Sequence, residues 1–209
     1  MTRQFEPWPK IPRLKRGMAI TEKIDGTNAS IAIFDNRVPD REHGSRIAHL
    51  PLLTVGDYDV YAGSRNRWLT RETDNFGFAN WVYDNIDSLI ALGVGKHFGE
   101  WWGSGIQRGY GLPKGEKRFS LFNSSRWLDY RAGIDPAGGQ EIAPVACHVV
   151  PLLKLWDFDT NVIDEVMETL RVHGSYAAPF MNPEGIVIYH AASRTIYKRT
   201  FEKDEGKGE

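Results

Sequence analysis

The sequence predicts an α+β fold with mostly antiparallel sheets. Two observations carry this prediction. Many short segments alternate apolar and polar residues and are bounded by turn residues, as half-buried strands are, whereas only two segments repeat their apolar residues at helical spacing. Short strands with two helices among them are typical of the α+β class.

The chain opens with a proline-rich, basic lead-in that ends at residue 16, and strands follow it. The alternating pattern predicts strands at residues 17–22, 29–34, 60–69, 97–103, 118–123, 144–150, 185–190 and 195–198. Asp25-Gly26 is a strong turn signal between the first two strands, the third runs into a basic bend, and the last two form a hairpin.

The two helices are expected at residues 75–92 and 160–172, and each pattern is stopped by a glycine, Gly93 and Gly174. Polar or glycine-rich sequence marks the intervening loops, at residues 35–49, 104–115 and 131–140. The charged tail, residues 202–209, is expected to fray.

Composition excludes several classes of protein. With 41% hydrophobic and 25% charged residues the chain is typical of a globular protein, and its 209 residues fit one domain, 1–209, or a large domain with a small appendage. No segment approaches the roughly 18 apolar residues of a membrane helix, so no membrane partner is expected. The net charge of −1 argues against a protein that coats polyanions but does not exclude nucleic acid.

The start of the chain lacks the apolar core of a secretory signal, and Cys147 is the only cysteine. A single cysteine allows no intrachain disulfide and no thiolate metal cluster, which fits a reducing compartment. We therefore expect a cytoplasmic protein, of a bacterial or phage-infected cell.

The stretch from Thr21 to Asn28 contains a lysine, Lys23, between two carboxylates and directly before the Asp25-Gly26 turn. As a surface lysine before a hairpin it would be unremarkable. As a nucleophile it would determine the function, so the other charged residues must distinguish these interpretations.

Charged side chains also stand at the ends of other expected strands, where a single charge is usually just solvated. These residues are Arg65, Glu100, Glu184 and Lys198. Taken together with Lys23 they describe a cleft with two lysines, an arginine and two carboxylates, rimmed by the aromatic residues Trp102, Phe119 and Phe122. Such a cleft suits a nucleoside triphosphate with a metal, because carboxylates bind Mg²⁺ and cations bind phosphates.

The order of these motifs resembles that of the covalent nucleotidyltransferases, the superfamily of polynucleotide ligases and capping enzymes. It is most similar to the ATP-dependent RNA ligase branch typified by T4 RNA ligase 2. The matching segments are Lys23-Ile24-Asp25-Gly26-Thr27-Asn28, Ser64-Arg65-Asn66-Arg67, Phe98-Gly99-Glu100-Trp101-Trp102-Gly103, Phe119-Ser120-Leu121-Phe122, Glu184-Gly185-Ile186-Val187 and Ile196-Tyr197-Lys198. They span residues 18–203. A lone K-x-D-G is weak evidence, but motifs in this order are strong evidence.

The resemblance implies a nucleotidyltransferase fold, with antiparallel sheets flanked by helices around an ATP cleft. It also implies that Lys23 attacks the α-phosphorus of ATP with Mg²⁺ or Mn²⁺ present. AMP then passes to a 5′-phosphate, and a 3′-hydroxyl finally displaces it. The expected partner is therefore a nucleic acid with such ends, and RNA is the first choice. A protonated lysine is a poor nucleophile, and neighbouring cations such as Lys198 and the metal favour its neutral form.

The same resemblance assigns a role to each site residue. Glu22 faces the adenine edge, either Phe119 or Phe122 stacks on the base, and the other packs in the core because neighbours on a strand face opposite ways. Glu100 accepts a hydrogen bond from the ribose, Glu184 binds the metal and Lys198 contacts the α-phosphate. Asn28 and Arg65 hold phosphate.

Two departures from the family pattern stand out. The fifth motif is usually Lys-x-Lys but here is Lys198-Arg199-Thr200, with Lys203 and Lys207 as alternative sources of a second cation. Few residues follow, so no OB or C-terminal accessory domain is expected. Nucleic acid would then be held by the glycine-rich loop, unless that loop is merely exposed; its candidate contact residues are Arg108, Tyr110, Lys114 and Lys117.

The sequence therefore predicts an ATP-dependent RNA ligase. The alternatives within the same chemistry are a DNA ligase and an enzyme that only adenylylates RNA ends. The alternative from another class is a non-catalytic nucleic-acid- or nucleotide-binding protein. The oligomeric state is not predicted.

Overall fold

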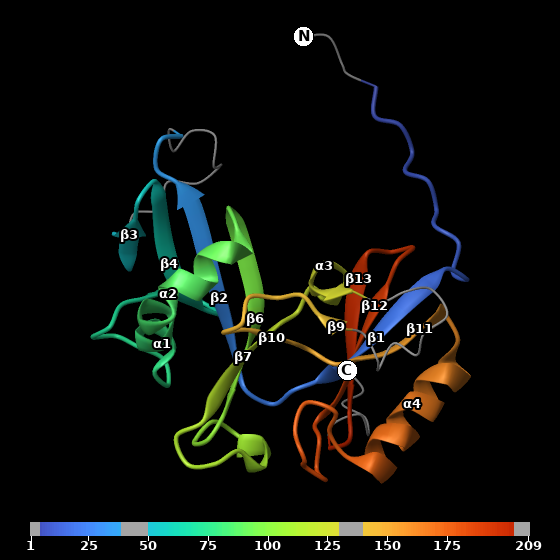
Figure 1. Cartoon of the computed structure of the whole chain (residues 1–209). Coiled ribbons are helices and arrows are strands. Elements are labelled where there is room, and N and C mark those ends of the chain that lie inside the picture. Colours follow the sequence, from blue (N-terminus) through green and yellow to red (C-terminus); the bar gives the residue numbers. More distant parts are fainter. Residues whose placement is uncertain (1–4, 39–49, 130–139, 203–209) are drawn as a thin grey trace.

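Two β-sheets stand side by side in the computed structural model, which describes residues 5–38, 50–129 and 140–202 (Figure 1). The smaller sheet has the strand order β11-β1-β12-β13. Its strands are β1 (Gly17–Lys23), β11 (Leu152–Asp157), β12 (Gly185–His190) and β13 (Thr195–Thr200), and all its pairs are antiparallel.

The larger sheet has the order β10-β7-β6-β2-β4-β3, and β5 pairs with β4. Its strands are β2 (Thr27–Asp35), β3 (Leu53–Val55), β4 (Tyr58–Ser64), β5 (Trp68–Leu69), β6 (Gly95–Gly103), β7 (Lys117–Leu121) and β10 (His148–Val149). The β10–β7 pair is parallel and the other pairs are antiparallel. A small separate ladder joins β8 (Leu128–Asp129) to β9 (Gln140–Glu141).

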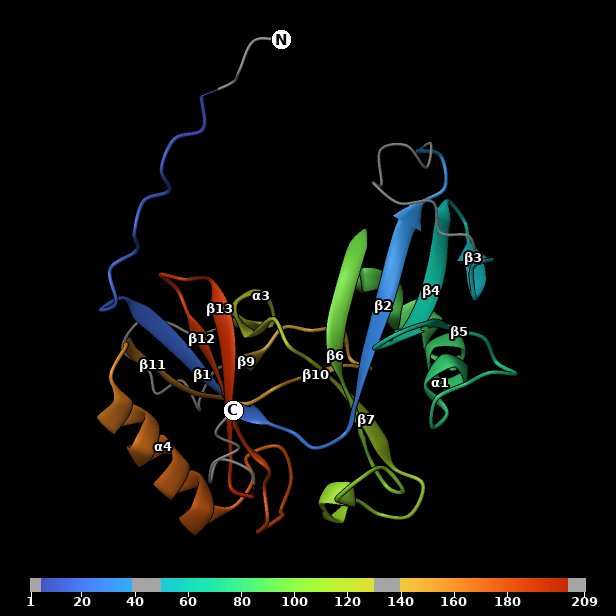
Figure 2. The same cartoon turned by 180° about the vertical axis from the view of Figure 1, so that it is seen from behind.

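Helices cover the sheets on different sides (Figures 1 and 2). Helix α4 (Thr160–His173) packs its apolar side on β1 and β12 of the smaller sheet through one core cluster. The helices on the larger sheet are α1 (Phe78–Asp84), α2 (Ile86–Leu89) and η1 (Ile90–Leu92). Two short helices, η2 (Gly109–Gly111) and α3 (Ser124–Trp127), lie in the loops on either side of β7. No helix in the described part of the chain is long and apolar enough to cross a membrane.

The predicted fold class is confirmed: the chain is α+β, its sheets are mostly antiparallel, and the final hairpin forms as β12 and β13. The predicted helix at 75–92 was wrong in its continuity, because Asn85 leaves helical geometry and separates α1 from α2. The strand predicted at 144–150 shrinks to the two residues of β10, and the edge strand β11 was missed. Residues 39–49, 131–139 and 203–209 of the predicted loops and tail lie outside the described residues.

Alternation along β1 decides which side chains can meet between the sheets. Met18 and Ile20 are buried against α4, so Thr21 and Lys23 point to the opposite face of the smaller sheet. A third core cluster, built around Ile24, Trp102 and Tyr110, joins the two sheets where β1 leads into β2. Residues at the end of β1 are thereby fixed relative to both sheets.

Candidate active site

A groove of about 1220 Å³ runs between the two sheets. Thr21 and Val187 line it from the smaller sheet, and Asn28, Phe98 and Phe122 line it from the larger sheet. Lys23, Asp25, Glu100 and Glu184 lie beyond Thr21 and outside the residues that line the groove, and we call their region the lysine end. The part of the groove around Gly17, Trp156, Asp157 and Tyr189 is the open end.

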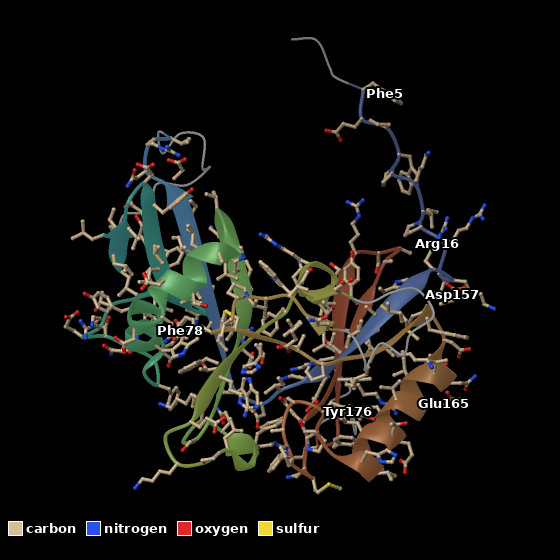
Figure 3. All side chains as sticks on the ribbon, in the orientation of Figure 1. Phe5, Arg16, Phe78, Asp157, Glu165 and Tyr176 are labelled. Atoms are coloured by element: carbon tan, nitrogen blue, oxygen red, sulfur yellow. The ribbon has the colours of Figure 1, made fainter. Side chains whose placement is uncertain are left out.

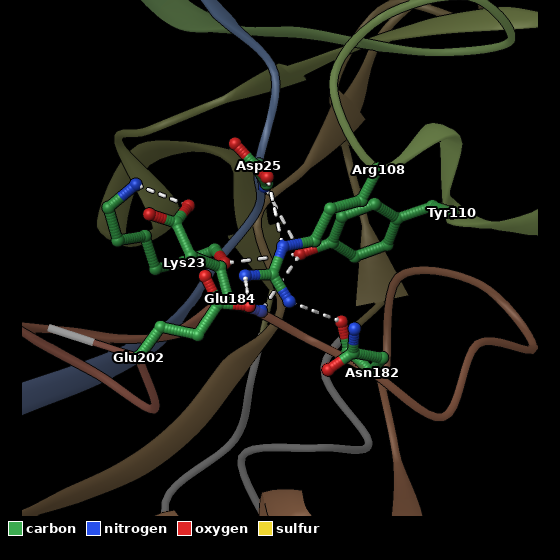
Figure 4. A network of polar contacts seen from close by, with 7 residues as sticks. All are labelled: Lys23, Asp25, Arg108, Tyr110, Asn182, Glu184 and Glu202. Carbon is green, nitrogen blue, oxygen red and sulfur yellow. Dashed lines mark hydrogen bonds and ion pairs between the residues drawn. The ribbon is translucent and has the colours of Figure 1, made fainter.

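Lys23 and Glu184 form the central contact of the lysine end (Figure 4). The Nζ atom of Lys23 lies 2.6 Å from Oε2 of Glu184, and the two side chains are 24% and 19% exposed. The contact follows from sheet register, because Lys23 is the last residue of β1 and pairs with Gly185, the first residue of β12. The two residues are 161 positions apart in the sequence. Lys23 is therefore a half-buried, fixed ammonium group and not a freely solvated surface lysine.

Gly26 makes the tight turn after Lys23 possible. A Cβ atom at this position would lie 2.5 Å from the carbonyl oxygen of Trp101 and 2.8 Å from the Cβ atom of Trp102. Real Cβ atoms essentially never approach this closely, so only glycine fits. The close approach presses the Lys23–Gly26 turn against β6, the strand that carries Glu100.

Tyr110 ties this turn to the segment that carries Glu184. Its hydroxyl accepts hydrogen bonds from the N–H groups of Asp25 (3.1 Å) and Glu184 (3.4 Å) and donates to the carbonyl oxygen of Lys23 (3.3 Å). The ring is fully buried in the cluster between the sheets. Tyr110 was predicted to contact nucleic acid; its burial makes it instead a positioning residue for Lys23 and Glu184.

Arg108 forms a second link at the same place (Figure 4). Its guanidinium lies 3.0 Å from the carboxylate of Asp25 and 2.5 Å from that of Glu202, and it donates to the carbonyl oxygen of Asn182 at 3.2 Å. With its side chain only 16% exposed, Arg108 is occupied by protein partners, which corrects the prediction that it contacts nucleic acid.

The other two predicted loop contacts differ from each other. Lys117 donates to the carbonyl oxygen of Phe76 at 2.6 Å, so it holds the segment before α1. Lys114 is exposed and remains a predicted nucleic-acid contact.

Glu100 lies across the groove from the smaller sheet, directly opposite Asn28 in the β2–β6 pair. Burial raises the pKa of Glu100 to about 7, and the charges of Glu184 and Asp25 add to the increase, while Lys23 and the N–H of Gly26 oppose it. The side chain is thus close enough to Lys23, Asp25 and Glu184 for their charges to act on it. Of these three carboxylates, Glu184 is the one that contacts Lys23 directly among the described residues, and Asp25 is paired with Arg108.

This carboxylate set fits a metal bound through few protein oxygens. In the described ranges, no three His, Cys, Asp or Glu side chains are grouped closely enough to hold a metal by themselves. Mg²⁺ usually takes only one or two protein carboxylates and completes its shell with water and phosphate oxygens. Glu184, half-buried and aimed at Lys23, has the donor chemistry for that role.

Phe119 and Phe122 lie on opposite sides of the larger sheet, as the alternation of side chains along a strand predicts. Phe119 is fully buried among Phe78 and Trp81 in the core of the larger sheet, so it is not the residue that stacks on a base. Phe122 is 40% exposed and lines the groove together with Val187 from the opposite sheet.

Val187 and Thr21 were missed as site residues, although the period of two along β12 and β1 places them on the same faces as Gly185 and Lys23.

The position of Glu22 differs from the predicted one at the edge of the adenine. It is 1% exposed and faces away from the groove, because it alternates with Lys23 along β1. Its Oε2 atom accepts hydrogen bonds from the N–H groups of Tyr176 and Ala177, at 2.8 and 3.2 Å. Burial raises its pKa, and Oε1 has no partner among the described residues. Glu22 thus holds the 175–178 loop, and Thr21 takes its expected place at the groove.

Asn28 and Arg65, both predicted to hold phosphate, lie at the same end of the larger sheet. Ala29 pairs with Ser64, so Arg65 follows β4 directly beside the start of β2, where Asn28 lines the groove. The Arg65 side chain is exposed. Both can therefore reach a ligand that enters between the sheets.

Lys198 pairs with Val187 on the neighbouring strand, and directly opposed residues project from the same face. It therefore shares the groove face, is exposed, and has no ion-pair partner in the described ranges. Arg199 points the other way and forms an ion pair with Asp164 of α4, so it does not supply a second cation to the groove. Lys203 and Lys207, the other proposed sources, lie outside the described residues.

Comparison with known proteins gives one family and one fold. A family model described as RNA ligase matches residues 17–203. No curated protein matches the sequence. The chain is similar to solved structures of variants of Naegleria gruberi RNA ligase, with ATP and Mn (17% identity, TM-score 0.51), without ligand (19%, 0.51) and with AMP and Mn (17%, 0.50). Each alignment covers 90% of this chain and 50% of the other, so the chain spans about half the length of these structures.

Proposed function

The chain belongs to the RNA ligase family, and from this premise we propose that it is an ATP-dependent RNA ligase that forms a covalent lysyl-AMP intermediate on Lys23. The enzyme joins a 5′-phosphate to a 3′-hydroxyl end. The observation that carries the proposal is the placement of Lys23, which lies beside Glu184, within the field of Glu100 and Asp25, and next to a groove large enough for a nucleotide.

The groove walls suit an adenosine. Phe122 from one sheet and Val187 from the other present apolar surfaces to the same space, and a purine placed there is covered on both faces. Thr21 and Asn28 add polar groups on the same lining. This arrangement leaves the phosphates pointing toward the lysine end, where Lys198 and Arg65 can approach them from opposite sheets.

The first step forms one bond and breaks another. The lone pair of Lys23 Nζ attacks the α-phosphorus, the bond from that phosphorus to the bridging oxygen breaks, and pyrophosphate leaves. The nitrogen loses its proton and retains AMP as a phosphoramidate. A 5′-phosphate oxygen of the RNA then displaces the lysine, and a 3′-hydroxyl finally displaces AMP. All three steps are substitutions at phosphorus, in which positioning and charge neutralisation provide most of the catalysis.

The ion pair with Glu184 holds the Lys23 side chain in place and occupies its nitrogen. Attack therefore requires that this ion pair separate. A divalent cation, when bound, supplies positive charge to the phosphate oxygens and competes for the Glu184 carboxylate. Glu100, whose pKa is about 7, can keep its carboxyl group protonated near neutral pH and donate to, or accept from, a ribose hydroxyl.

Incubation with α-labelled ATP and Mg²⁺ or Mn²⁺ tests the lysyl-AMP proposal. We expect label to remain on the denatured protein and to be lost in Lys23→Ala. An unlabelled wild-type protein, or a labelled Lys23→Ala variant, would contradict the proposal and favour a binding protein without catalysis.

The RNA assignment is tested with nicked duplexes that carry either ribose or deoxyribose at the 3′-hydroxyl side. We expect the ribose end to be sealed. Strong sealing of all-DNA nicks with none at the ribose end would identify a DNA ligase. Accumulation of adenylylated 5′ ends without sealing on either substrate would identify an end adenylyltransferase.

A further inference from the structure

An extended N-terminal arm, residues 5–16, leaves the body of the protein at the start of β1 (Figures 1 and 2). It joins neither sheet and contains no helix. Four large apolar side chains on it are exposed to solvent: Phe5 (86%), Trp8 (85%), Ile11 (83%) and Leu14 (66%). Figure 3 shows Phe5 far from any other element. Exposing an apolar series of this kind is unfavourable in water unless a ligand covers it.

The arm has a sequence period of three. The four apolar residues are spaced three apart, and so are the basic residues Lys10, Arg13 and Arg16. A polyproline II helix has three residues per turn and a rise of about 3.1 Å per residue, so each series forms one row with a spacing of about 9 Å. Prolines at positions 7, 9 and 12 favour this conformation for themselves and for the residue before each of them. The pattern therefore favours a stiff, extended arm over residues 5–13, with one apolar row and one basic row, before the backbone bends at residues 14–16.

The root of the arm is fixed at the open end of the groove. The imidazole Nε2 of His190 lies 2.9 Å from the carbonyl oxygen of Leu14, and the N–H of Phe158 donates to the carbonyl oxygen of Arg16 at 2.8 Å. Gly17, the next residue, lines the groove. A ligand held along the arm is thus led directly to the open end, where Trp156 and Tyr189 are also exposed.

We propose that the arm binds a single-stranded segment of the RNA substrate and guides it into the groove. This inference rests on the proposed function, because it assigns a place to the RNA of that reaction. Four cations and one carboxylate give residues 5–16 a charge of +3, whereas the whole chain carries −1, so the positive charge is concentrated here. Lys10, Arg13 and Arg16 neutralise phosphates, and the rings of Phe5 and Trp8 stack on bases, the combination by which proteins hold single strands.

A protein domain that recognises proline-rich segments is the competing partner for such an arm. The arm contains a P-x-x-P spacing, Pro9-Lys10-Ile11-Pro12, which such a domain could read. The combination of four cations with two exposed aromatic rings favours RNA, because phosphates and bases together engage both features. The test below separates the two.

Binding of a fluorescently labelled, 5′-phosphorylated single-stranded RNA is measured by anisotropy in the full-length protein at salt concentrations between about 50 and about 200 mM. One variant removes the two rings (Phe5→Ala with Trp8→Ala), and another removes two cations (Lys10→Ser with Arg13→Ser). The matched controls are Tyr83→Ala on α1 and Arg171→Ser on α4, which remove an exposed ring and an exposed cation far from the arm.

The ring variant is expected to bind RNA at least about fivefold more weakly for each base that loses its stacking partner. The cation variant is expected to reduce the slope of log K against log salt by about 1.4, or about 0.7 for each lost phosphate contact. Both controls should bind as the wild type does.

The same samples are tested for covalent labelling by α-labelled ATP without RNA. Arm variants that label normally but bind RNA as tightly as the wild type overturn this inference and leave the lysyl-AMP proposal standing. A wild-type protein that does not label contradicts the proposed function, whether or not it binds RNA. If the arm variants retain RNA binding and lose only a co-purifying protein, the proline-recognising partner is correct and the RNA-binding arm is wrong.

Discussion

The two ends of the groove differ in how their side chains are held. At the lysine end, Arg108 and Tyr110 reach in from a distant loop and bind Asp25 and the backbone of Lys23, Asn182 and Glu184. At the open end, Trp156 and Tyr189 are 56% and 41% exposed and lie on the strands β11 and β12, and the Trp156 ring is contacted by the Lys154 ammonium group at 5.3 Å from its centroid.

The difference follows from the chemistry proposed for each end. A displacement at phosphorus needs the attacking nitrogen fixed to within a fraction of an ångström, which requires a buried, hydrogen-bonded surround. Holding a flexible strand needs surfaces that tolerate several positions, and exposed rings provide them. Substitutions matched between the two ends should therefore have unequal effects.

The largest difference in stability is expected between substitutions of two glycines, one at each end of the groove. Gly26→Ala places a Cβ atom 2.5 Å from a backbone oxygen, so we expect a loss of about 3 kcal/mol or more in the free energy of unfolding, together with loss of covalent labelling. Gly17→Ala at the open end meets its nearest atom only at 4.0 Å and should change stability by less than about 0.5 kcal/mol. Urea unfolding of both variants measures the difference. Equal stability of the two variants would show that the turn after Lys23 is not rigidly packed.

A smaller difference is expected between two tyrosines. Tyr110→Phe keeps the buried ring but leaves the N–H groups of Asp25 and Glu184 without their shared acceptor. We expect a loss of about 1–3 kcal/mol in stability and slower labelling of Lys23, with ATP binding less affected than the rate. Tyr189→Phe, at the open end, is the control and should label at the wild-type rate. A Tyr110→Phe variant that is less stable but labels at full rate would limit Tyr110 to a structural role.

The smallest difference between the two ends is expected in how the stability of the protein depends on pH. Burial raises the pKa of Glu100 from 4.5 to about 7, so between these values the unfolded chain releases a proton that the folded protein retains. The wild type therefore loses stability as pH rises through this window, and the loss is complete above about pH 7. Glu100→Gln should remove this loss, so its stability relative to the wild type should increase from about pH 5 to about pH 7.5.

Asp157→Asn is the control for this experiment, because Asp157 lies at the exposed open end. Denaturant unfolding at several pH values gives the comparison. If the Glu100→Gln difference is the same at all pH values, the carboxyl group does not titrate in this window.

Local patterns predicted the elements that carry the motifs. The alternation in β1, β2, β6 and β12 and the turn at Asp25-Gly26 are visible in the sequence. Lys23 ends β1 and Glu184 directly precedes β12, whereas Glu100 lies inside β6 and not at a strand end. The continuous helix at 75–92 failed because periodicity does not detect a backbone break at Asn85. The edge strand β11 was missed because its pairing with β1 gives no strong local signal.

The site was predicted less completely where a side chain's direction or partner matters. Alternation determined that only one of Phe119 and Phe122 could face a ligand, but the packing of α1 decided that Phe119 is the buried one. The same periodicity, applied to β1, would have turned Glu22 away from the groove and put Thr21 in its place. The family pattern had assigned the role to Glu22 instead.

The sequence by itself determined the family and the strands that carry Lys23, the proposed nucleophile, because these depend on residue types at short spacings. Only the tertiary structure revealed what holds Lys23 and the turn after it. Arg108 lies 83 residues from Asp25, Tyr110 lies 85 residues from it, and Glu184 lies 161 residues from Lys23. Contacts over such separations depend on strand register and on the packing of the two sheets against each other, which no local pattern specifies.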